Sequence, residues 1–151
     1  MASKLRVTSW RAPELVARVS QVLEDFGPYV AFQAEQEIAK DQYDWPVATL
    51  RKNNQLVPAG KRDIIDTGTL LNSATTPQVF RGASSASLQI AWTAPYAYEV
   101  LDGYVVGNSQ GNYIAPKRNW IAKTYAQLGP GGERPFLPFL VQRWNQLAAK
   151  R

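Results

Sequence analysis

The side chains of this sequence that could support chemistry are carboxylates and hydroxyls. Its 151 residues include no cysteine and no histidine. Disulfides, thiolate nucleophiles, and the commonest general base and metal ligand are therefore excluded. Without histidine, no serine hydroxyl has the usual base to activate it, and we expect no acyl transfer. The serines considered are Ser73, Ser84, Ser85 and Ser87.

Four aspartates form the best candidate for a metal site, namely Asp41, Asp44, Asp63 and Asp66. Carboxylates in such a group could hold a hard cation such as Mg²⁺ for phosphodiester chemistry. However, Asp66 is placed to cap a helix, Asp63 adjoins Arg62, and no nuclease spacing connects the four. We interpret them as caps and solvated charges.

The glycine-rich stretch "GPGGER", residues 129–134, could be mistaken for a phosphate-binding loop. It has no lysine and no following serine or threonine, so it lacks the residues that a P-loop uses. We therefore expect no enzyme activity, no metal and no cofactor.

The composition predicts a single domain over residues 1–151. Apolar residues make up 45% of the chain, which is enough for one core. Lysine and arginine number 17 against 12 acidic residues, giving a net charge of +5, but the cations are spread in ones and twos. We interpret them as a solvated surface, with a small basic nucleic-acid-binding protein as the alternative. No stretch approaches the roughly 20 apolar residues of a membrane span, so we expect a soluble protein made in a cytoplasm.

The elements that must position any site begin with an amphipathic helix from Pro13 to about Lys40. Its apolar residues recur at steps of three and four, and the phase continues across Gly27-Pro28, which predicts one kinked helix. The stripe consists of Val16, Val19, Leu23, Phe26, Val30, Ala34 and Ile38.

A long loop from Gln42 to Gly60 should follow this helix, with an extended piece at most. The next stretch, "KRDIIDTGTLLNSA" at residues 61–74, predicts a short helix of about two turns. Asp66 or Thr67 would cap it, Gly68 would permit the close turn, and Leu70 would be buried.

Beyond Pro77 the apolar residues alternate with others, as is typical of β-strands, and no longer recur at helical spacing. "QVFRGASS" with "ASLQIAWTA", and "YVVGNSQGNYIAP", predict two antiparallel hairpins. "PYAYEVLDG" predicts a short helix or turn closed by Gly103, and "RPFLPFLVQRWNQLAAKR" predicts a C-terminal helix with Leu137, Leu140, Trp144 and Leu147 on its apolar face. The fold class is α+β: a long kinked N-terminal helix and a C-terminal helix packed on an antiparallel β-sheet with long loops.

The aromatic residues have two interpretations. In an exposed groove they could stack on nucleic-acid bases, but Trp92 and Trp144 are in phase with apolar stripes, which favours packing. Within the long loop, bulky apolar residues have no period that would bury them, so we predict a protein–protein interface with a basic rim. Alternatively the loop folds back and Trp45 caps the core. The candidate interface residues are Tyr43, Trp45, Leu50, Arg51, Lys52, Leu56 and Val57.

Four motifs occur in order along most of the chain: "WPVATLRKNN", "RDIIDTGTLLNSA", "PYAYEVLDG" and "RPFLPFL". Together they resemble the tail-completion and head-tail joining proteins of long-tailed bacteriophages, which are also called minor tail or neck proteins. In this chain Glu99 stands further from Gly103 than in the family pattern. On this resemblance, a structural joint without catalytic function is formed by Asp66, Thr67, Gly68, Leu70 and Ser73. Ser73 would finish its short helix with a local hydrogen bond.

The resemblance also implies partners and a location. The protein would form a homo-oligomeric ring, a hexamer or dodecamer, at the neck of the virion. The ring would contact portal or connector proteins and tail-tube or tail-terminator proteins, with weak contact to packaged DNA and none to a membrane. It would be assembled in the cytoplasm of the bacterial host.

Overall fold

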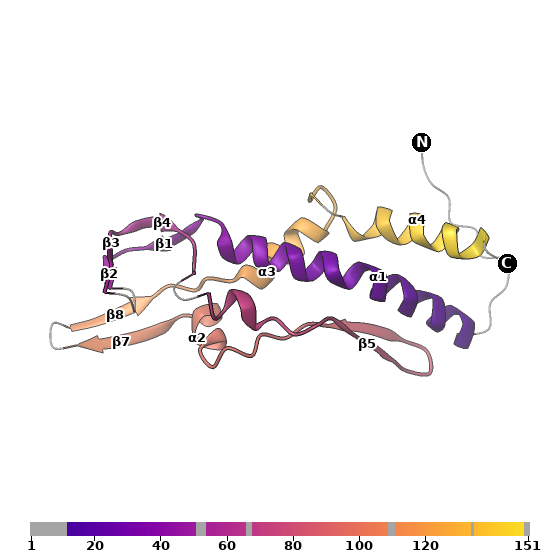
Figure 1. The fold of residues 1–151 in the computed structure, drawn as a ribbon, viewed down its shortest axis with the longest axis horizontal. Helices are drawn as coiled ribbons and strands as arrows, with labels where there is room; N and C mark the ends of the chain where they lie inside the picture. The colour runs from indigo at the N-terminus through magenta and orange to yellow at the C-terminus, as the bar shows by residue number, and fades with distance from the viewer. Residues whose placement is uncertain (1–11, 51–53, 66–67, 109–110, 134, 150–151) are drawn as a thin grey trace. The chain divides into compact units, whose positions relative to one another are not determined.

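The computed structural model describes residues 12–50, 54–65, 68–108, 111–133 and 135–149 (Figure 1). The chain is α+β, as predicted, and the strands among these described residues pair in four antiparallel two-stranded sheets. In order, the elements are α1 (Ala12–Ala39), β1 (Tyr43–Trp45), β2 (Thr49–Leu50), β3 (Leu56–Val57), β4 (Gly60–Arg62), the 3₁₀ turn η1 (Leu71–Ser73), β5 (Gln78–Arg81), β6 (Ala86–Gln89), α2 (Ala97–Asp102), β7 (Tyr104–Asn108), β8 (Gly111–Ala115), α3 (Trp120–Leu128) and α4 (Phe136–Ala149).

The described residues belong to two compact units. Unit 1 takes its residues from 1–32, 76–90 and 125–151, and unit 2 from 33–75 and 91–124. The expectation of one domain over residues 1–151 stays a prediction.

The long N-terminal helix is confirmed as one element. It runs through Pro28, whose ring nitrogen cannot donate the helical hydrogen bond to the Glu24 carbonyl. The predicted stripe turns inward in both units, since Phe26 is buried in unit 1 and Ala34 and Ile38 are buried in unit 2. A buried serine, Ser20, donates its hydroxyl proton to the Val16 carbonyl at 2.7 Å and so needs no other partner.

In unit 1, aromatic rings join the first part of α1 to α4. The Phe26 ring centroid lies 4.9 Å from that of Phe136 and 4.8 Å from that of Phe139. The Arg143 Nε also donates to an Asp25 carboxylate oxygen at 2.5 Å, which joins the same two helices. The C-terminal helix is therefore confirmed, although Leu137, expected on its buried face, is exposed.

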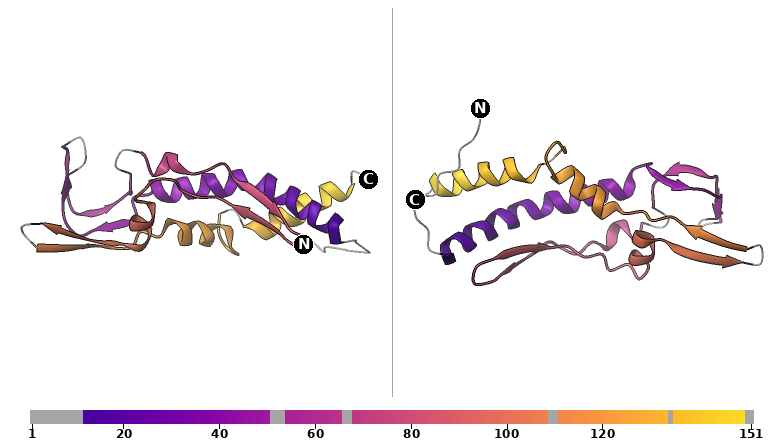
Figure 2. Two further views of the ribbon diagram at one scale, coloured as in Figure 1. Left: turned by 90° about the horizontal axis from the view of Figure 1, so that it is seen from below. Right: turned by 180° about the vertical axis from the view of Figure 1, so that it is seen from behind.

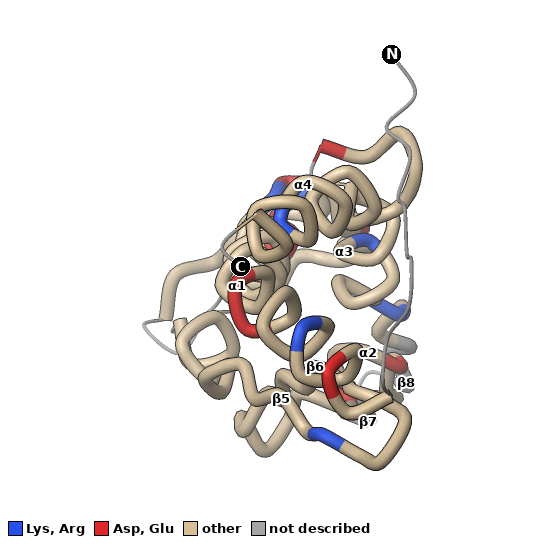
Figure 3. The backbone as a smooth tube through the Cα atoms, turned by 90° about the vertical axis from the view of Figure 1, so that its right-hand side faces the viewer, with Lys and Arg blue, Asp and Glu red and all other residues tan. Residues whose placement is uncertain are grey.

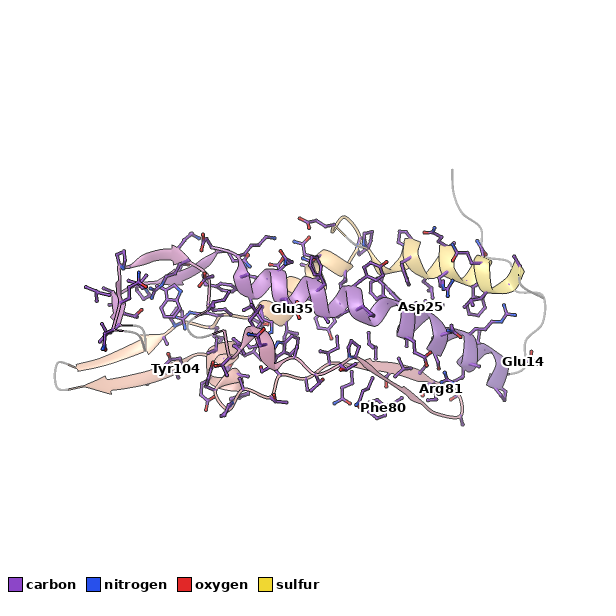
Figure 4. All side chains as sticks on the ribbon, viewed as in Figure 1. Glu14, Asp25, Glu35, Phe80, Arg81 and Tyr104 are labelled. Carbon is purple, nitrogen blue, oxygen red and sulfur yellow. The ribbon has the colours of Figure 1, made fainter. Side chains whose placement is uncertain are left out.

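The hairpin β5–β6 completes unit 1. Its register pairs Val79 with Leu88, and β5 carries the exposed Phe80 and the neighbouring Arg81 (Figure 4). Gly27 of α1 lies against the start of this hairpin, because a Cβ there would fall 2.7 Å from the Pro77 Cβ. The glycine in "FGPY" thus serves close packing between helix and hairpin as well as tolerating the proline.

Unit 2 is built around a core to which seven of the described residues contribute buried side chains. The end of α1, β1, the segment before η1 and the start of α3 contribute to it, and partly buried aromatic residues pack around it. The core consists of Ala34, Ile38, Tyr43, Ile64, Leu70, Ala94 and Trp120.

The segment 42–60 is more regular than the predicted long loop. Within it β2 pairs with β3, and β1 pairs with β4, which begins at its last residue; both pairings are antiparallel (Figure 1). The second predicted hairpin is confirmed as β7–β8, which stands as a separate two-stranded ribbon (Figure 2). Gly103, with φ at +83°, ends α2 as expected, in a conformation that other residues rarely adopt.

Candidate functional site

The end of α1 is fastened to β1 by hydrogen bonds around Glu37, which is only 1% exposed. Its carboxylate accepts from Gln33, Lys40 and Gln42 at 2.8 to 3.1 Å, and its carbonyl accepts the Tyr43 hydroxyl at 2.6 Å. Burial by itself raises the pKa of Glu37, but the hydrogen bonds and the charge of Lys40 outweigh it and hold that pKa below its ordinary value. Burial also raises the pKa of the Tyr43 hydroxyl far above its usual range.

Alternation along β1 directs Tyr43 and Trp45 to one face of the strand and Asp44 to the other. Asp44 is exposed and faces Lys61, its register partner on β4, with 3.6 Å between Nζ and the carboxylate. Opposite Trp45 stands Gly60, which has no side chain. The diagonal position on β4 is Arg62, which is therefore within reach of the indole.

Two guanidinium groups stack on the Trp45 indole. The Cζ of Arg62 lies 3.9 Å from its ring centroid, and that of Arg118 lies 3.8 Å from it. Two planar groups at such distances cannot share one face, so one lies on each side of the ring. The indole Nε1 also donates to the Asp63 carbonyl at 3.1 Å, which fixes the ring orientation. We call Trp45, Arg62 and Arg118 the stacked cluster.

Arg118 is the buried member of the stacked cluster, with 2% of its surface exposed. It enters from the segment between β8 and α3, where its backbone N–H donates to the Val100 carbonyl. Within the described part of the chain, its Nε and Nη2 are buried and have no hydrogen-bond acceptor. A buried cation is costly without a bonded partner, and stacking on an indole satisfies none of its N–H groups.

Only part of the predicted structural joint falls within the described residues. Asp66 and Thr67 lie outside them, so their capping role stays a prediction. Gly68 has φ at +76°, consistent with its predicted turn, and Leu70 is buried in the core. The Ser73 hydroxyl donates to the Leu70 carbonyl at 2.9 Å, which confirms the local hydrogen bond.

The helix predicted in this joint is shorter than expected. It is the single 3₁₀ turn η1, and no side chain caps it at Leu70. Instead, the segment after it turns toward the strand-like residues that follow β6. Ser73 accepts from the Thr93 N–H at 3.0 Å, and Ala74 pairs with Trp92 in an isolated bridge. The backbone groups bond across to another segment rather than extending the helix.

The predicted interface residues divide into two groups. Tyr43 is 3% exposed, so its interpretation as an exposed interface residue is wrong. Trp45 packs on the core of unit 2, which agrees with the alternative in which the loop folds back over its own domain. Leu50 and Leu56 are 64% and 68% exposed and stand opposite each other in the β2–β3 ladder, with Val57 partly buried beside them. Arg51 and Lys52 lie outside the described residues. Binding of a partner by this segment stays a prediction.

The described aspartates of the candidate metal set bond to backbone N–H groups or face a lysine. Asp41 accepts the Asp63 backbone N–H at 3.0 Å, and the Asp63 carboxylate accepts the Ile65 N–H at 2.9 Å. Asp44 faces Lys61, and Asp66 lies outside the described residues. Over the part of the chain that the structure describes, no three acidic side chains gather in a way that could hold a metal ion.

The sequence reasoning missed the buried charges of unit 2. Glu37 and Arg118 are among its most buried side chains, yet charged residues are ordinarily assigned to the surface. The segment "KRNW", residues 117–120, shows no apolar periodicity that would predict the burial of Arg118. The charged positions are otherwise dispersed, as Figure 3 illustrates for one view of the backbone.

Comparison of the chain with protein-family models, curated protein sequences and solved structures finds no match. Among the helices in the described ranges, none combines the length and the apolarity that crossing a membrane requires.

Proposed function

We propose that this protein is a structural subunit of a tailed bacteriophage, forming part of a ring at the neck that completes the tail and joins it to the capsid connector. The ordered motifs that resemble tail-completion and neck proteins motivate the proposal. Its partners would be further copies of itself, the portal or connector proteins, and the tail-tube or terminator proteins. Its location would be the virion, and its function would not be enzymatic.

The single observation that carries the proposal is the exposed leucine pair of the β2–β3 ribbon. Leu50 and Leu56 form a cross-strand pair, so they present one continuous apolar spot. Isolated leucines on a surface are common, but a paired apolar spot on a two-residue ribbon gains little stability within its own chain. A second copy of the chain that covers the spot would bury both side chains, which supports a subunit of an assembly.

The arrangement of strands supports the same proposal. Each sheet among the described residues has only two strands, so each retains unpaired backbone edges. On β7–β8, Val105 is exposed as well. Two-stranded ribbons are marginally stable alone, and their edges are suited to pairing with another chain. A closed ring is the arrangement in which every subunit could satisfy such edges in the same way.

Deletion of the gene from the phage tests the proposal directly. We expect filled heads and separate tails to accumulate, and complementation with the wild-type gene to restore joined particles. Normal infectious particles from the deletion would refute the proposal. Tight, steeply salt-dependent DNA binding by the purified monomer, without any ring, would instead favour a nucleic-acid-binding protein.

A further inference from the structure

The geometry points to a carboxylate-binding site at Arg118, which receives an aspartate or glutamate side chain from a neighbouring copy of the chain. The chemistry of this site follows from the stacked cluster, and only the identity of the neighbour rests on the proposed function.

Two nitrogens on one edge of the Arg118 guanidinium lack hydrogen-bond acceptors among the described residues. Nε and Nη2 are the two donors on one edge of a guanidinium, and their parallel N–H bonds match the two oxygens of a carboxylate. In Arg118 both are buried, and neither has an acceptor among the described residues. Stacking on Trp45 occupies a face of the group and leaves this edge for an in-plane partner.

The group that would accept from Arg118 should carry a negative charge. In unit 2 the Nε1 atoms of Trp92 and Trp120 are also buried without an acceptor among the described residues, and the two rings pack edge-on with centroids 5.8 Å apart. The described residues of the unit thus bury an excess of donors. An acceptor, and at Arg118 an anionic one, is the chemistry that would satisfy them.

The burial of this edge favours a carboxylate side chain over a phosphodiester. The Arg118 edge is closed to solvent in the isolated chain, so neighbouring side chains must shift before a ligand binds. A slender carboxylate side chain needs a small shift, whereas a nucleic-acid backbone needs an open surface. Tryptophan and arginine are also the residues that most often dominate the binding energy of protein interfaces. An acidic side chain of a protein therefore fits the site better than a phosphodiester.

The isolated chain provides the first test, through the neutral variant Arg118→Met. The unpaired buried charge costs more than its stacking on Trp45 returns, and the methionine side chain still packs against the ring. This variant should therefore unfold at the same temperature as the wild type or higher. Arg143→Met is the matched control, since Arg143 has an ion pair with Asp25, and it should unfold at a lower temperature. If Arg118→Met loses as much stability as the control does, the guanidinium is already satisfied and the inference is wrong.

Added anions test the class of ligand. At equal ionic strength, sodium acetate should raise the unfolding temperature of the wild type above its value in chloride, and this difference should be absent in Arg118→Met. Equal responses of the two proteins to acetate would overturn the inference. A difference seen with inorganic phosphate but not with acetate would overturn the carboxylate assignment.

Self-association tests the identity of the neighbour. Removing one member of a buried charge pair should weaken association about 30-fold or more in sedimentation experiments on Arg118→Met, while Arg143→Met associates like the wild type. Unchanged association of Arg118→Met would exclude a neighbouring copy as the source of the carboxylate. If the wild type itself forms no oligomer, the proposed function fails, and the acetate comparison still decides the chemistry of the site.

Discussion

Truncation of Trp45 distinguishes a residue that belongs to the fold of unit 2 from one that serves only an interface. Trp45→Ala removes the indole, and with it the two stacking contacts with guanidinium groups and the hydrogen bond to the Asp63 carbonyl. Each stacking contact is worth about 0.5 to 2 kcal/mol, and the hydrogen bond about 1 kcal/mol. The ring also packs on the core, although it is only partly buried.

These contributions sum to about 2 to 5 kcal/mol. Because the ring is only partly buried, we expect a loss of about 2 to 4 kcal/mol in the free energy of unfolding, somewhat below the range for a fully buried tryptophan. For a chain of this size, that loss corresponds to a fall of about 4 to 16 °C in the unfolding midpoint. Urea and thermal unfolding, followed by circular dichroism at a concentration where the protein is monomeric, would measure it.

Leu56→Ala is the matched control on the neighbouring ribbon. Its side chain is 68% exposed, so truncation should change the unfolding free energy by less than about 0.5 kcal/mol. We expect the same variant to reduce ring formation or incorporation into particles, because it removes half of the exposed leucine pair. Unfolding of Trp45→Ala at the wild-type urea concentration would refute the stacked cluster as a stabilising feature.

Two further predictions concern the helix α1. Gly27→Ala should destabilise unit 1 by about 1 to 3 kcal/mol in thermal unfolding, because the new methyl group would meet Pro77 at 2.7 Å, and a gain in stability would contradict the close packing. Glu37 has a lowered pKa in the folded state, so its stabilising effect is complete above its unfolded value of about 4.5 and is lost as the pH falls through the folded value. Unfolding free energies measured from pH 6 down to about pH 3 should therefore fall less steeply in Glu37→Gln, and identical slopes in variant and wild type would show that Glu37 is not the group that titrates.

Local patterns predicted most of the elements. The helical stripe predicted α1, and alternation around small residues predicted both long hairpins, since each depends on residues that are neighbours in the sequence. Gly68 and Gly103 were correctly expected at turns, because both have positive φ, a conformation that glycine adopts without strain. The regular pairing within 42–60 was missed, since ribbons of two or three residues are too short to show a period.

The sequence by itself determined the α+β class, the principal helices and hairpins, and the chemistry that the chain lacks without cysteine and histidine. Only the tertiary structure decided that Tyr43 and Trp45 turn inward while Leu50 and Leu56 stay exposed. It also brought Arg62 and Arg118 to the same indole from positions far apart in the chain. The physical reason is that local periodicity specifies which face of an element is apolar. The burial of a charge, in contrast, depends on which distant segment covers it.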